Sequence, residues 1–144
     1  MNDFLTLDKQ LCFAVYETAG EFNKLYTSAL LEFGLTYPQY LVLLSLWERD
    51  GVTVKELGET VSLGTGTLTP MVARMEANGW LRKVRSKEDE RKVHIHLQKK
   101  AIEQTQAITG KIVDAVKACG IEYEEYESLL RLLNSLTRKI RNRA

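Results

Sequence analysis

The hydrophobic pattern of this chain changes its period once, and that change predicts a hairpin between helices. Up to Asn78, apolar residues recur at three- and four-residue steps, which is typical of amphipathic helices. From residue 80 to residue 97 the period becomes two, and Val93, Ile95 and Leu97 alternate with two histidines. The helical period then returns and continues towards the C-terminal end. We therefore predict a mostly α-helical fold with one small β-hairpin.

Capping and stop signals divide the helical regions. Thr36 with Gln39 forms a capping-box signature around Pro38, which is tolerated in a first helical turn. Pro70 cannot lie deep in a helix, so the helix that contains it must begin near Thr65. The predicted helices span about 8–33, 37–48, 53–61, 65–78, 99–118 and 122–141, the strands span 80–84 and 93–97, and the charged segment "RSKEDERK" (85–92) forms the hairpin tip.

Two short helices followed by a charged hairpin predict a winged helix-turn-helix, with 65–78 as the recognition helix. Its first turn offers hydroxyl side chains, its N-terminus attracts phosphate, and cations of the hairpin can enter a minor groove. A charged hairpin tip alone can be a solvated turn, but the threonine- and glycine-rich helix start before it favours DNA. The DNA-binding candidates are Thr65, Thr67, Thr69, Arg74, Arg85, Lys87, Asp89 and Arg91.

Charge supports a local polyanion site. Residues 82–100 carry eight lysines and arginines against three acids, although the formal net charge of the chain is only +1. We expect no membrane segment, because no apolar run approaches ~20 residues. Asp3 and the lack of a cationic start argue against a signal peptide, and two cysteines without such a signal favour the cytoplasm. His94 and His96 share a strand face without a third ligand, so we expect neither a metal nor a cofactor.

The length of 144 residues predicts a single domain. Residues 35–98 would form its DNA-binding part, and residues 1–34 and 99–144 would form flanking helices. The apolar stripes of these helices exceed what a small winged helix can cover, which predicts dimerisation. A symmetric homodimer would present two recognition helices to the half-sites of a pseudo-palindromic operator in double-stranded DNA.

Several motifs together resemble a known family. The element order and the "DERKVHIHL" wing resemble the MarR family of dimeric winged-helix regulators. The segments "QLCFAVY", "TYPQYLVLLSLWE" and "GTLTPMVARMEANG" resemble its organic hydroperoxide-sensing branch, the OhrR repressors, and the resemblance covers nearly the whole chain. It implies a repressor that releases its operator when a cysteine is oxidised. The chain has Gly64-Thr65 where the family often has Asp-Ser, which leaves the operator sequence open.

The resemblance also implies roles for individual residues. Cys12 corresponds to the redox-sensing cysteine, and Cys119 matches the position range of the resolving cysteine in the two-cysteine members. Tyr26 and Tyr37 correspond to tyrosines that hydrogen-bond the thiolate across the dimer, and Tyr16 to a further pocket tyrosine. Arg91 corresponds to the wing arginine placed in the minor groove, with Asp89 helping to hold the wing.

Residue chemistry leaves alternatives beside these roles. A free cysteine thiol with a pKa of ~8.5 is mostly protonated at cytoplasmic pH, and only the thiolate attacks a peroxide. Tyrosine hydroxyls favour the anion, and so does the positive end of the helix if Cys12 lies in its first turn. Apolar neighbours of Cys12 favour an organic hydroperoxide. Either cysteine can instead be an inert core thiol. Two other functions remain: a MarR-type repressor released by a small aromatic ligand, and a thiol peroxidase, against which the basic wing argues. We predict a protein that is not an enzyme.

Overall fold

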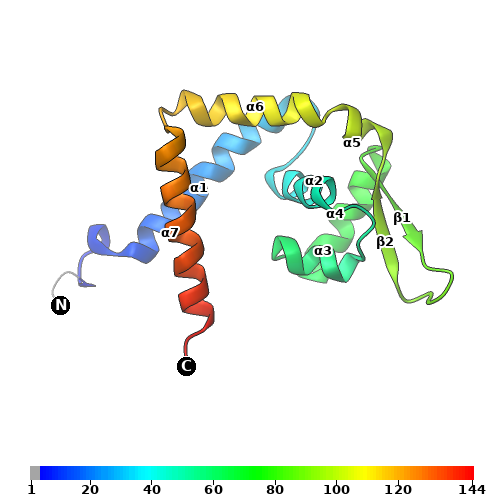
Figure 1. Ribbon diagram of the computed structural model, residues 1–144, viewed down its shortest axis with the longest axis horizontal. Coiled ribbons are helices and arrows are strands. Elements are labelled where there is room, and N and C mark those ends of the chain that lie inside the picture. Colours follow the sequence, from blue (N-terminus) through cyan, green and yellow to red (C-terminus); the bar gives the residue numbers. More distant parts are fainter. Residues whose placement is uncertain (1–3) are drawn as a thin grey trace.

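The computed structural model describes residues 4–144 and contains a helical chain with one β-hairpin (Figure 1), which confirms the predicted fold class. Its elements are, in chain order, the 3-10 turn η2 (Leu7–Lys9), helix α1 (Leu11–Leu30), the 3-10 turn η3 (Leu31–Phe33), helices α2 (Tyr37–Glu48), α3 (Val54–Val61) and α4 (Thr65–Ala77), strands β1 (Leu81–Arg85) and β2 (Val93–Leu97), and helices α5 (Lys99–Glu103), α6 (Thr105–Ala118) and α7 (Tyr123–Arg141).

Three predicted elements differ from the observed ones. The helix expected over 8–33 begins only at Leu11, because the backbone of Gln10 is extended with φ −90° and ψ 117°. The helix expected over 99–118 is broken at Gln104, where the Thr105 hydroxyl donates to the carbonyls of Ala101 and Ile102, both at 3.0 Å. Strand β1 begins one residue later than expected, because the Trp80 N–H donates to the carbonyl of Met75 in the last turn of α4, at 2.9 Å.

A capping side chain starts α2 as predicted, and a threonine and a glutamate with the same spacing start α3. Thr36 Oγ1 accepts from the Gln39 N–H at 3.3 Å, and Gln39 Oε1 accepts from the Thr36 N–H at 3.1 Å, so α2 has a full capping box. At α3, Thr53 Oγ1 accepts from the Glu56 N–H at 3.1 Å. The Glu56 carboxylate accepts from the Thr53 hydroxyl rather than from its N–H, so only half of that box forms.

The hydrophobic core joins the short helices to the hairpin. Leu46 of α2, Leu57 of α3 and Leu68 of α4 are all fully buried. Burying such a leucine stabilises the fold by about 1.5–3 kcal/mol, so this packing fixes how the short helices cross. The other buried apolar residues are Ala29, Leu30, Leu35, Tyr40, Val42, Leu43, Val72, Met75, Trp80, Leu81, Ile95, Ala101, Ile108 and Ile112.

The hairpin is antiparallel and is attached to the loop before α3. Its register runs from Leu81 opposite Leu97 to Arg85 opposite Val93. The outer edge of β2 is occupied by that loop, because the Ile95 N–H donates to the Val52 carbonyl at 2.8 Å. The wing is therefore fixed to the helix-turn-helix along one edge.

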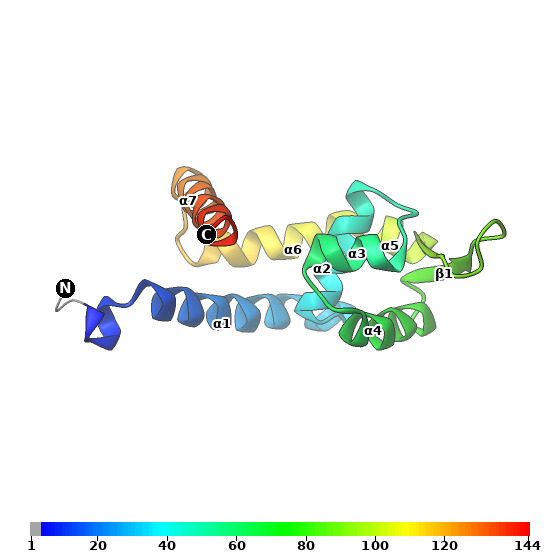
Figure 2. The same ribbon diagram turned by 90° about the horizontal axis from the view of Figure 1, so that it is seen from below.

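The flanking helices lie outside the winged helix (Figures 1 and 2). α1 and α6 lie side by side, and Lys111 Nζ of α6 lies 2.9 Å from Glu32 Oε1 of η3, the turn that follows α1. α7 follows the far end of α6 and has no buried residue. Much apolar surface is thus left uncovered by the chain itself. It includes Phe4, Leu5, Leu7, Leu11, Val15 and Tyr16 near the N-terminus and Tyr123, Tyr126, Leu129, Leu130, Leu132, Leu133 and Ile140 on α7.

Between residues 4 and 144, no single helix is long and apolar enough to cross a bilayer, although the consecutive segments 11–33 and 37–48, bent by 75°, reach that length and composition together.

Candidate functional site

The first turn of α4 faces solvent. Thr65, Thr67 and Thr69 are exposed, whereas Leu68 is fully buried and anchors the helix in the core. No side chain caps this helix start, so its first N–H groups and the positive end of the helix dipole are open to an anion. Arg74 is also exposed, later on the same helix. All four candidates on α4 therefore lie on accessible surface.

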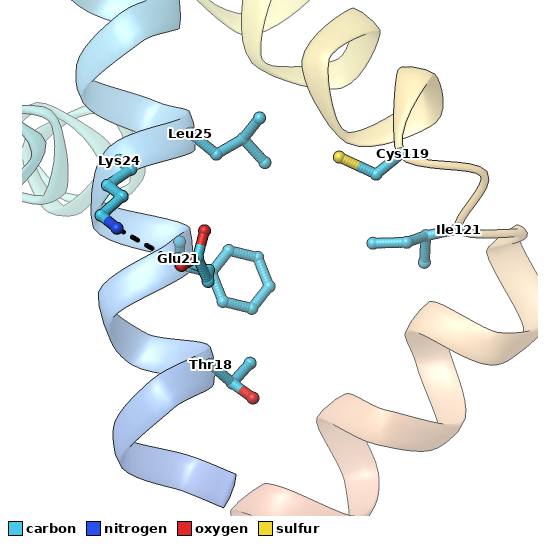
Figure 3. A pocket seen from close by; sticks show the side chains of 7 residues that line it. Thr18, Glu21, Lys24, Leu25, Cys119 and Ile121 are labelled. Atoms are coloured by element: carbon cyan, nitrogen blue, oxygen red, sulfur yellow. Dashed lines mark hydrogen bonds and ion pairs between the residues drawn. The ribbon is translucent and has the colours of Figure 1, made fainter.

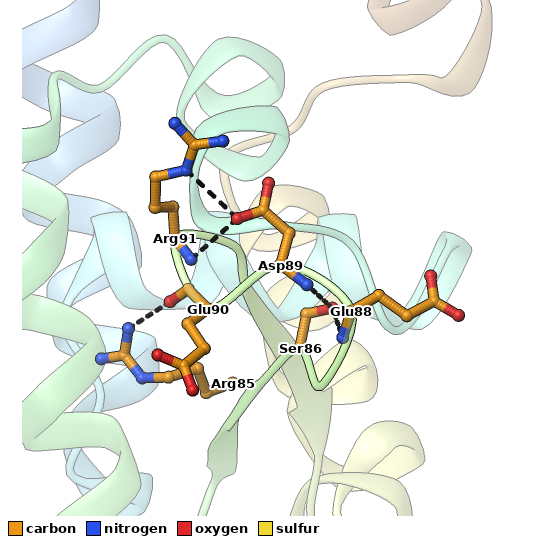
Figure 4. Close-up of polar contacts among 6 residues, drawn as sticks. All are labelled: Arg85, Ser86, Glu88, Asp89, Glu90 and Arg91. Carbon is orange, nitrogen blue, oxygen red and sulfur yellow. Dashed lines mark hydrogen bonds and ion pairs between the residues drawn. The ribbon is translucent and has the colours of Figure 1, made fainter.

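The hairpin tip is held by its own side chains (Figure 4). Ser86 Oγ accepts from the N–H groups of Glu88 and Asp89, each at 3.2 Å. The Arg85 guanidinium donates to the carbonyl of Glu90. These bonds order a tip that is almost wholly charged.

One arginine of the wing is oriented by an aspartate. Asp89 Oδ1 accepts from both the backbone N–H and Nε of Arg91, at 3.1 and 3.2 Å (Figure 4). These two hydrogen bonds, the backbone one first, hold the pKa of Asp89 below its usual range. The Arg91 side chain is nevertheless 91% exposed. Asp89 thus turns a flexible side chain into a directed cation at the surface, which suits insertion into a minor groove.

The other two cations of the wing differ in their contacts. Lys87 and Arg85 are both exposed, and the guanidinium of Arg85 donates one hydrogen bond to the Glu90 carbonyl. α4 packs beside β1 (Figure 2). We call α4 together with the wing, residues 65–97, the reading head.

Cys12 is the second residue of α1 and is exposed. Its Sγ lies 3.9 Å from Gln10 Oε1, the acceptor within reach of the thiol. Neighbouring Leu11 and Tyr16 are 62% and 75% exposed. Within one copy of the chain, therefore, this thiol fills no core. It lies in the first turn of a long helix.

Two of the three predicted pocket tyrosines meet each other. The rings of Tyr26 and Tyr37 are in edge contact at a centroid distance of 5.1 Å, which joins α1 to α2. Tyr16 lies elsewhere, stacked on Phe13 at 6.3 Å near the start of α1. Tyr26 follows Cys12 by fourteen residues on α1, about 21 Å along a helix. The structure of one copy therefore does not bring Cys12 together with Tyr26 or Tyr37.

Burial keeps the Tyr26 phenol protonated. Burial first, and then the neighbouring Tyr126, Tyr40 and Tyr37, raise its pKa to about 12. Burial likewise raises the pKa of Tyr40. A phenol that is protonated throughout the physiological range remains a hydrogen-bond donor, which is the form that can stabilise a thiolate.

Cys119 caps the end of α6 and faces α1 across a groove (Figure 3). The groove has a volume of ≈ 450 Å³, and its apolar lining includes Phe22, Leu25 and Ile121. The thiol is exposed and its Sγ lies 3.4 Å from the carbonyl of Ala115. Cys119 therefore lies opposite the stretch of α1 between Thr18 and Leu25, which follows Cys12 along the helix, and both thiols are free.

Two residues that sequence reasoning missed also belong to these sites. Tyr40 is 5% exposed and lies 5.8 Å from Tyr26, centroid to centroid, so it completes the aromatic contact between α1 and α2. Its spacing of three from Tyr37 on a well-capped helix was the available signal. Glu76 of α4 accepts a hydrogen bond from the Lys83 N–H of β1, a contact that no sequence pattern indicates.

The two histidines of β2 hold a loop. His94 Nδ1 lies 2.9 Å from the Gly51 carbonyl, and His96 Nδ1 lies 3.9 Å from Asp50 Oδ2. Across residues 4–144, no group of three or more His, Cys, Asp or Glu side chains is arranged to hold a metal ion.

Comparison with known proteins gives the family. The model of the family described as "Transcriptional regulator SarA/Rot" matches residues 24–108. The chain is 43% identical to the HTH-type transcriptional regulator TtmR of Methylorubrum extorquens (strain PA1), over 99% of this chain and 73% of that protein. It is 42% identical to the organic hydroperoxide resistance transcriptional regulator of Bacillus subtilis (strain 168), over 95% of this chain and 96% of that one.

Solved structures agree. The structure described as reduced AbfR bound to DNA, a protein of Staphylococcus epidermidis, superimposes with a TM-score of 0.81 at 34% identity, covering 93% of this chain and 94% of that one. The same protein in the form described as disulfide-formed has a TM-score of 0.69 at 32% identity, with 97% and 93% covered. This chain therefore belongs to the SarA/Rot family of transcriptional regulators, which have the MarR-like winged-helix fold.

Proposed function

We propose that the chain is a homodimeric repressor that senses organic hydroperoxides through Cys12 and then releases its operator. One observation carries this proposal: an exposed thiol in the first turn of a long helix, in a chain 42% identical to an organic hydroperoxide resistance regulator. A thiol retained merely for packing would be expected to be buried.

A second copy is the natural cover for the exposed flanking helices. Leu11, Val15 and Tyr16 surround the sensor turn, and a further stripe follows α7. Monomeric proteins rarely leave such continuous apolar stripes in water. In a two-fold symmetric dimer, the Tyr26–Tyr37 pair of one copy supplies donors to Cys12 of the other, which supports a pocket completed only on dimerisation.

The DNA-binding surface is the first turn of α4 together with the wing. Thr65, Thr67, Thr69 and Arg74 contact backbone and base edges in a major groove, and Arg91, held by Asp89, enters the neighbouring minor groove with Arg85 and Lys87 beside it. Two such heads fit a pseudo-palindromic operator.

The redox step at Cys12 needs only the hydroperoxide as oxidant. The thiolate sulfur attacks the distal peroxide oxygen, the O–O bond breaks, and the alkoxide leaves and takes up a proton as the alcohol. Cys12 is thereby oxidised to a sulfenic acid. The thiolate of Cys119 from the second copy then attacks this sulfur, and hydroxide leaves as water when it takes up a proton. An intersubunit disulfide results, and the geometry of the two reading heads changes.

The decisive experiment compares wild type with C12S in a DNA-binding assay on the promoter beside the gene of this protein. Cumene hydroperoxide should release wild type, whereas C12S, nearly equal in volume but without a nucleophile, should bind DNA and stay bound. C119S leaves the sensor and removes the proposed resolving thiol, so it shows separately whether release needs the disulfide. Release of C12S at the wild-type rate would refute the proposal.

One observation favours a second candidate function. The apolar groove beside Cys119 is large enough for a small aromatic molecule, as in a regulator released by ligand binding without redox chemistry. An aromatic acid that releases both wild type and C12S from DNA would support this function. A thiol peroxidase would instead consume many equivalents of peroxide per chain with a reductant present, and we propose that this chain does not.

A further inference from the structure

One side chain ties the recognition helix to the wing. Glu76 lies in the last turn of α4, and its Oε2 accepts a hydrogen bond from the backbone N–H of Lys83 on β1, with N and O 2.7 Å apart. Its other oxygen, Oε1, lies 3.9 Å from Lys83 Nζ. We propose that Glu76 is a positioning residue for DNA binding, which sets the wing at the correct distance and angle from the recognition helix.

The strand geometry explains why this contact is available. The Gln98 N–H donates to the Trp80 carbonyl at 2.9 Å, which makes that pair a hydrogen-bonded pair of the antiparallel ladder. Such pairs alternate, so Lys83, opposite Ile95, belongs to a pair that exchanges no backbone bonds. Its N–H therefore points to the free edge of β1, and Glu76 occupies that edge.

The two edges of the hairpin are thus held by different elements. The loop before α3 holds β2 through the Ile95 N–H, and α4 holds β1 through Glu76. β1 is the strand that leads into the tip carrying Arg91. A shift of β1 against α4 moves that arginine relative to the first turn of α4, and the two can then no longer fit adjacent grooves of one operator.

The charge of Glu76 predicts in which direction its replacement changes DNA affinity. The Glu76 side chain is 37% exposed, and its negative charge in a DNA-reading head repels phosphates. Removing that charge should therefore strengthen DNA binding unless the carboxylate has a geometric role. Glu76→Gln removes the charge but keeps an acceptor oxygen at the same reach. Glu76→Asp keeps the charge but is one methylene too short to reach the Lys83 N–H.

The test measures the affinity of the full-length dimer for its promoter DNA, and it rests on the proposed DNA-binding surface. We expect E76D to bind roughly tenfold more weakly, about the loss that one charge-assisted hydrogen bond represents. E76Q should bind as tightly as wild type or more tightly. E59Q, which removes the charge of an exposed glutamate on α3, is the matched control for the effect of charge alone.

A double variant separates positioning from general destabilisation. If Glu76 acts by placing Arg91, E76D should weaken binding much less in an R91A background, where the arginine to be placed is absent. Equal losses in both backgrounds would overturn the proposal, as would E76D binding like wild type or E76Q binding as weakly as E76D. R91A alone tests the proposed DNA-binding surface, so the two failures are distinguishable.

A measurement on the wild type keeps the proposal testable if E76D does not fold. Hydrogen exchange should show the Lys83 amide protected in wild type and in E76Q, although it lies on an outer strand edge without a backbone partner. Exchange of that amide at the rate of an open edge would overturn the proposal.

Discussion

A single methyl group added to α3 should disturb the turn that leads into the recognition helix. Gly58 is buried, and a Cβ at this position would lie 2.8 Å from the Leu63 carbonyl oxygen and 3.5 Å from Leu68 Cδ2. The first distance is too short for real Cβ contacts. The carbonyl cannot retreat easily, because the Leu63 N–H is bonded to the Gly58 carbonyl at 2.9 Å.

Two opposing effects set the magnitude of Gly58→Ala. Replacing glycine by alanine inside a helix contributes about 1 kcal/mol of stability. Overpacking a well-packed site costs about 1–3 kcal/mol, and this clash involves backbone rather than a mobile side-chain end. A backbone clash belongs in the upper part of that range, about 2–3 kcal/mol, so we expect a net loss of about 1–2 kcal/mol. For a chain of 144 residues that loss lowers the melting temperature by roughly 3–7 °C.

The assay is thermal unfolding followed by circular dichroism, at equal protein concentration. Gly110→Ala is the matched control: it makes the same change inside α6, where an added Cβ meets nothing within 4 Å, so it should not destabilise the chain. DNA affinity of G58A, measured below its melting temperature, should also fall, because the displaced turn precedes α4. A G58A protein as stable as wild type would refute the reasoning.

Three further predictions concern the candidate sites. Arg91→Ala should leave folding intact, weaken operator binding, and make the slope of log K against log salt shallower by about one unit, and an unchanged affinity and slope would contradict its role. Peroxide-treated wild type should run as a covalent dimer on a non-reducing gel and return to monomer with dithiothreitol, whereas C119S should remain monomeric. If mass spectrometry of the oxidised wild type finds no peptide that joins Cys12 to Cys119 of the second copy, disulfide formation is excluded as the mechanism of release. The pKa of Tyr26 is about 12 in the folded chain and 10.0 in the unfolded chain, so its protonated form stabilises the fold below pH 10. This contribution to stability should be lost as the pH rises towards 12. An absorbance titration in which every tyrosine ionises near pH 10 would contradict this.

The fold could be predicted because its signals are local. The capping box at Thr36, the proline at position 70 and the period of two around Ile95 each act over a few residues. The break at Gln104 was missed for a physical reason. Its sequence neighbours are compatible with a helix, and the contacts at the break include one from a distant residue: the Ala101 carbonyl accepts from the Thr105 hydroxyl and also from Trp47 Nε1, at 3.1 Å.

The candidate sites were predictable in part. Exposure of Cys12 agrees with a reactive thiol, but its apolar neighbours in the sequence resemble a core, and only the structure shows them uncovered. The Glu76–Lys83 contact could not be predicted, since it depends on which edge of β1 faces α4. Hairpin register and helix packing together determine that edge, and neither is encoded in a short motif.

The Tyr26–Tyr37 contact links the proposed chemistry to the reading head. Tyr26 lies on α1, and Tyr37 begins α2, the helix that leads into the helix-turn-helix, so their rings at 5.1 Å form the joint between flanking and DNA-binding parts. In the proposed dimer the same two hydroxyls donate to the thiolate of the second copy. Oxidation replaces that thiolate by a neutral sulfenic acid and then by a disulfide, and both remove the anion that the hydroxyls face. In this proposal the change acts directly on the contact between the two tyrosines: the ring of each tyrosine holds the packing, and its hydroxyl responds to the charge of the thiolate. Tyr26→Phe or Tyr37→Phe should therefore slow sensing and leave the contact between the rings intact.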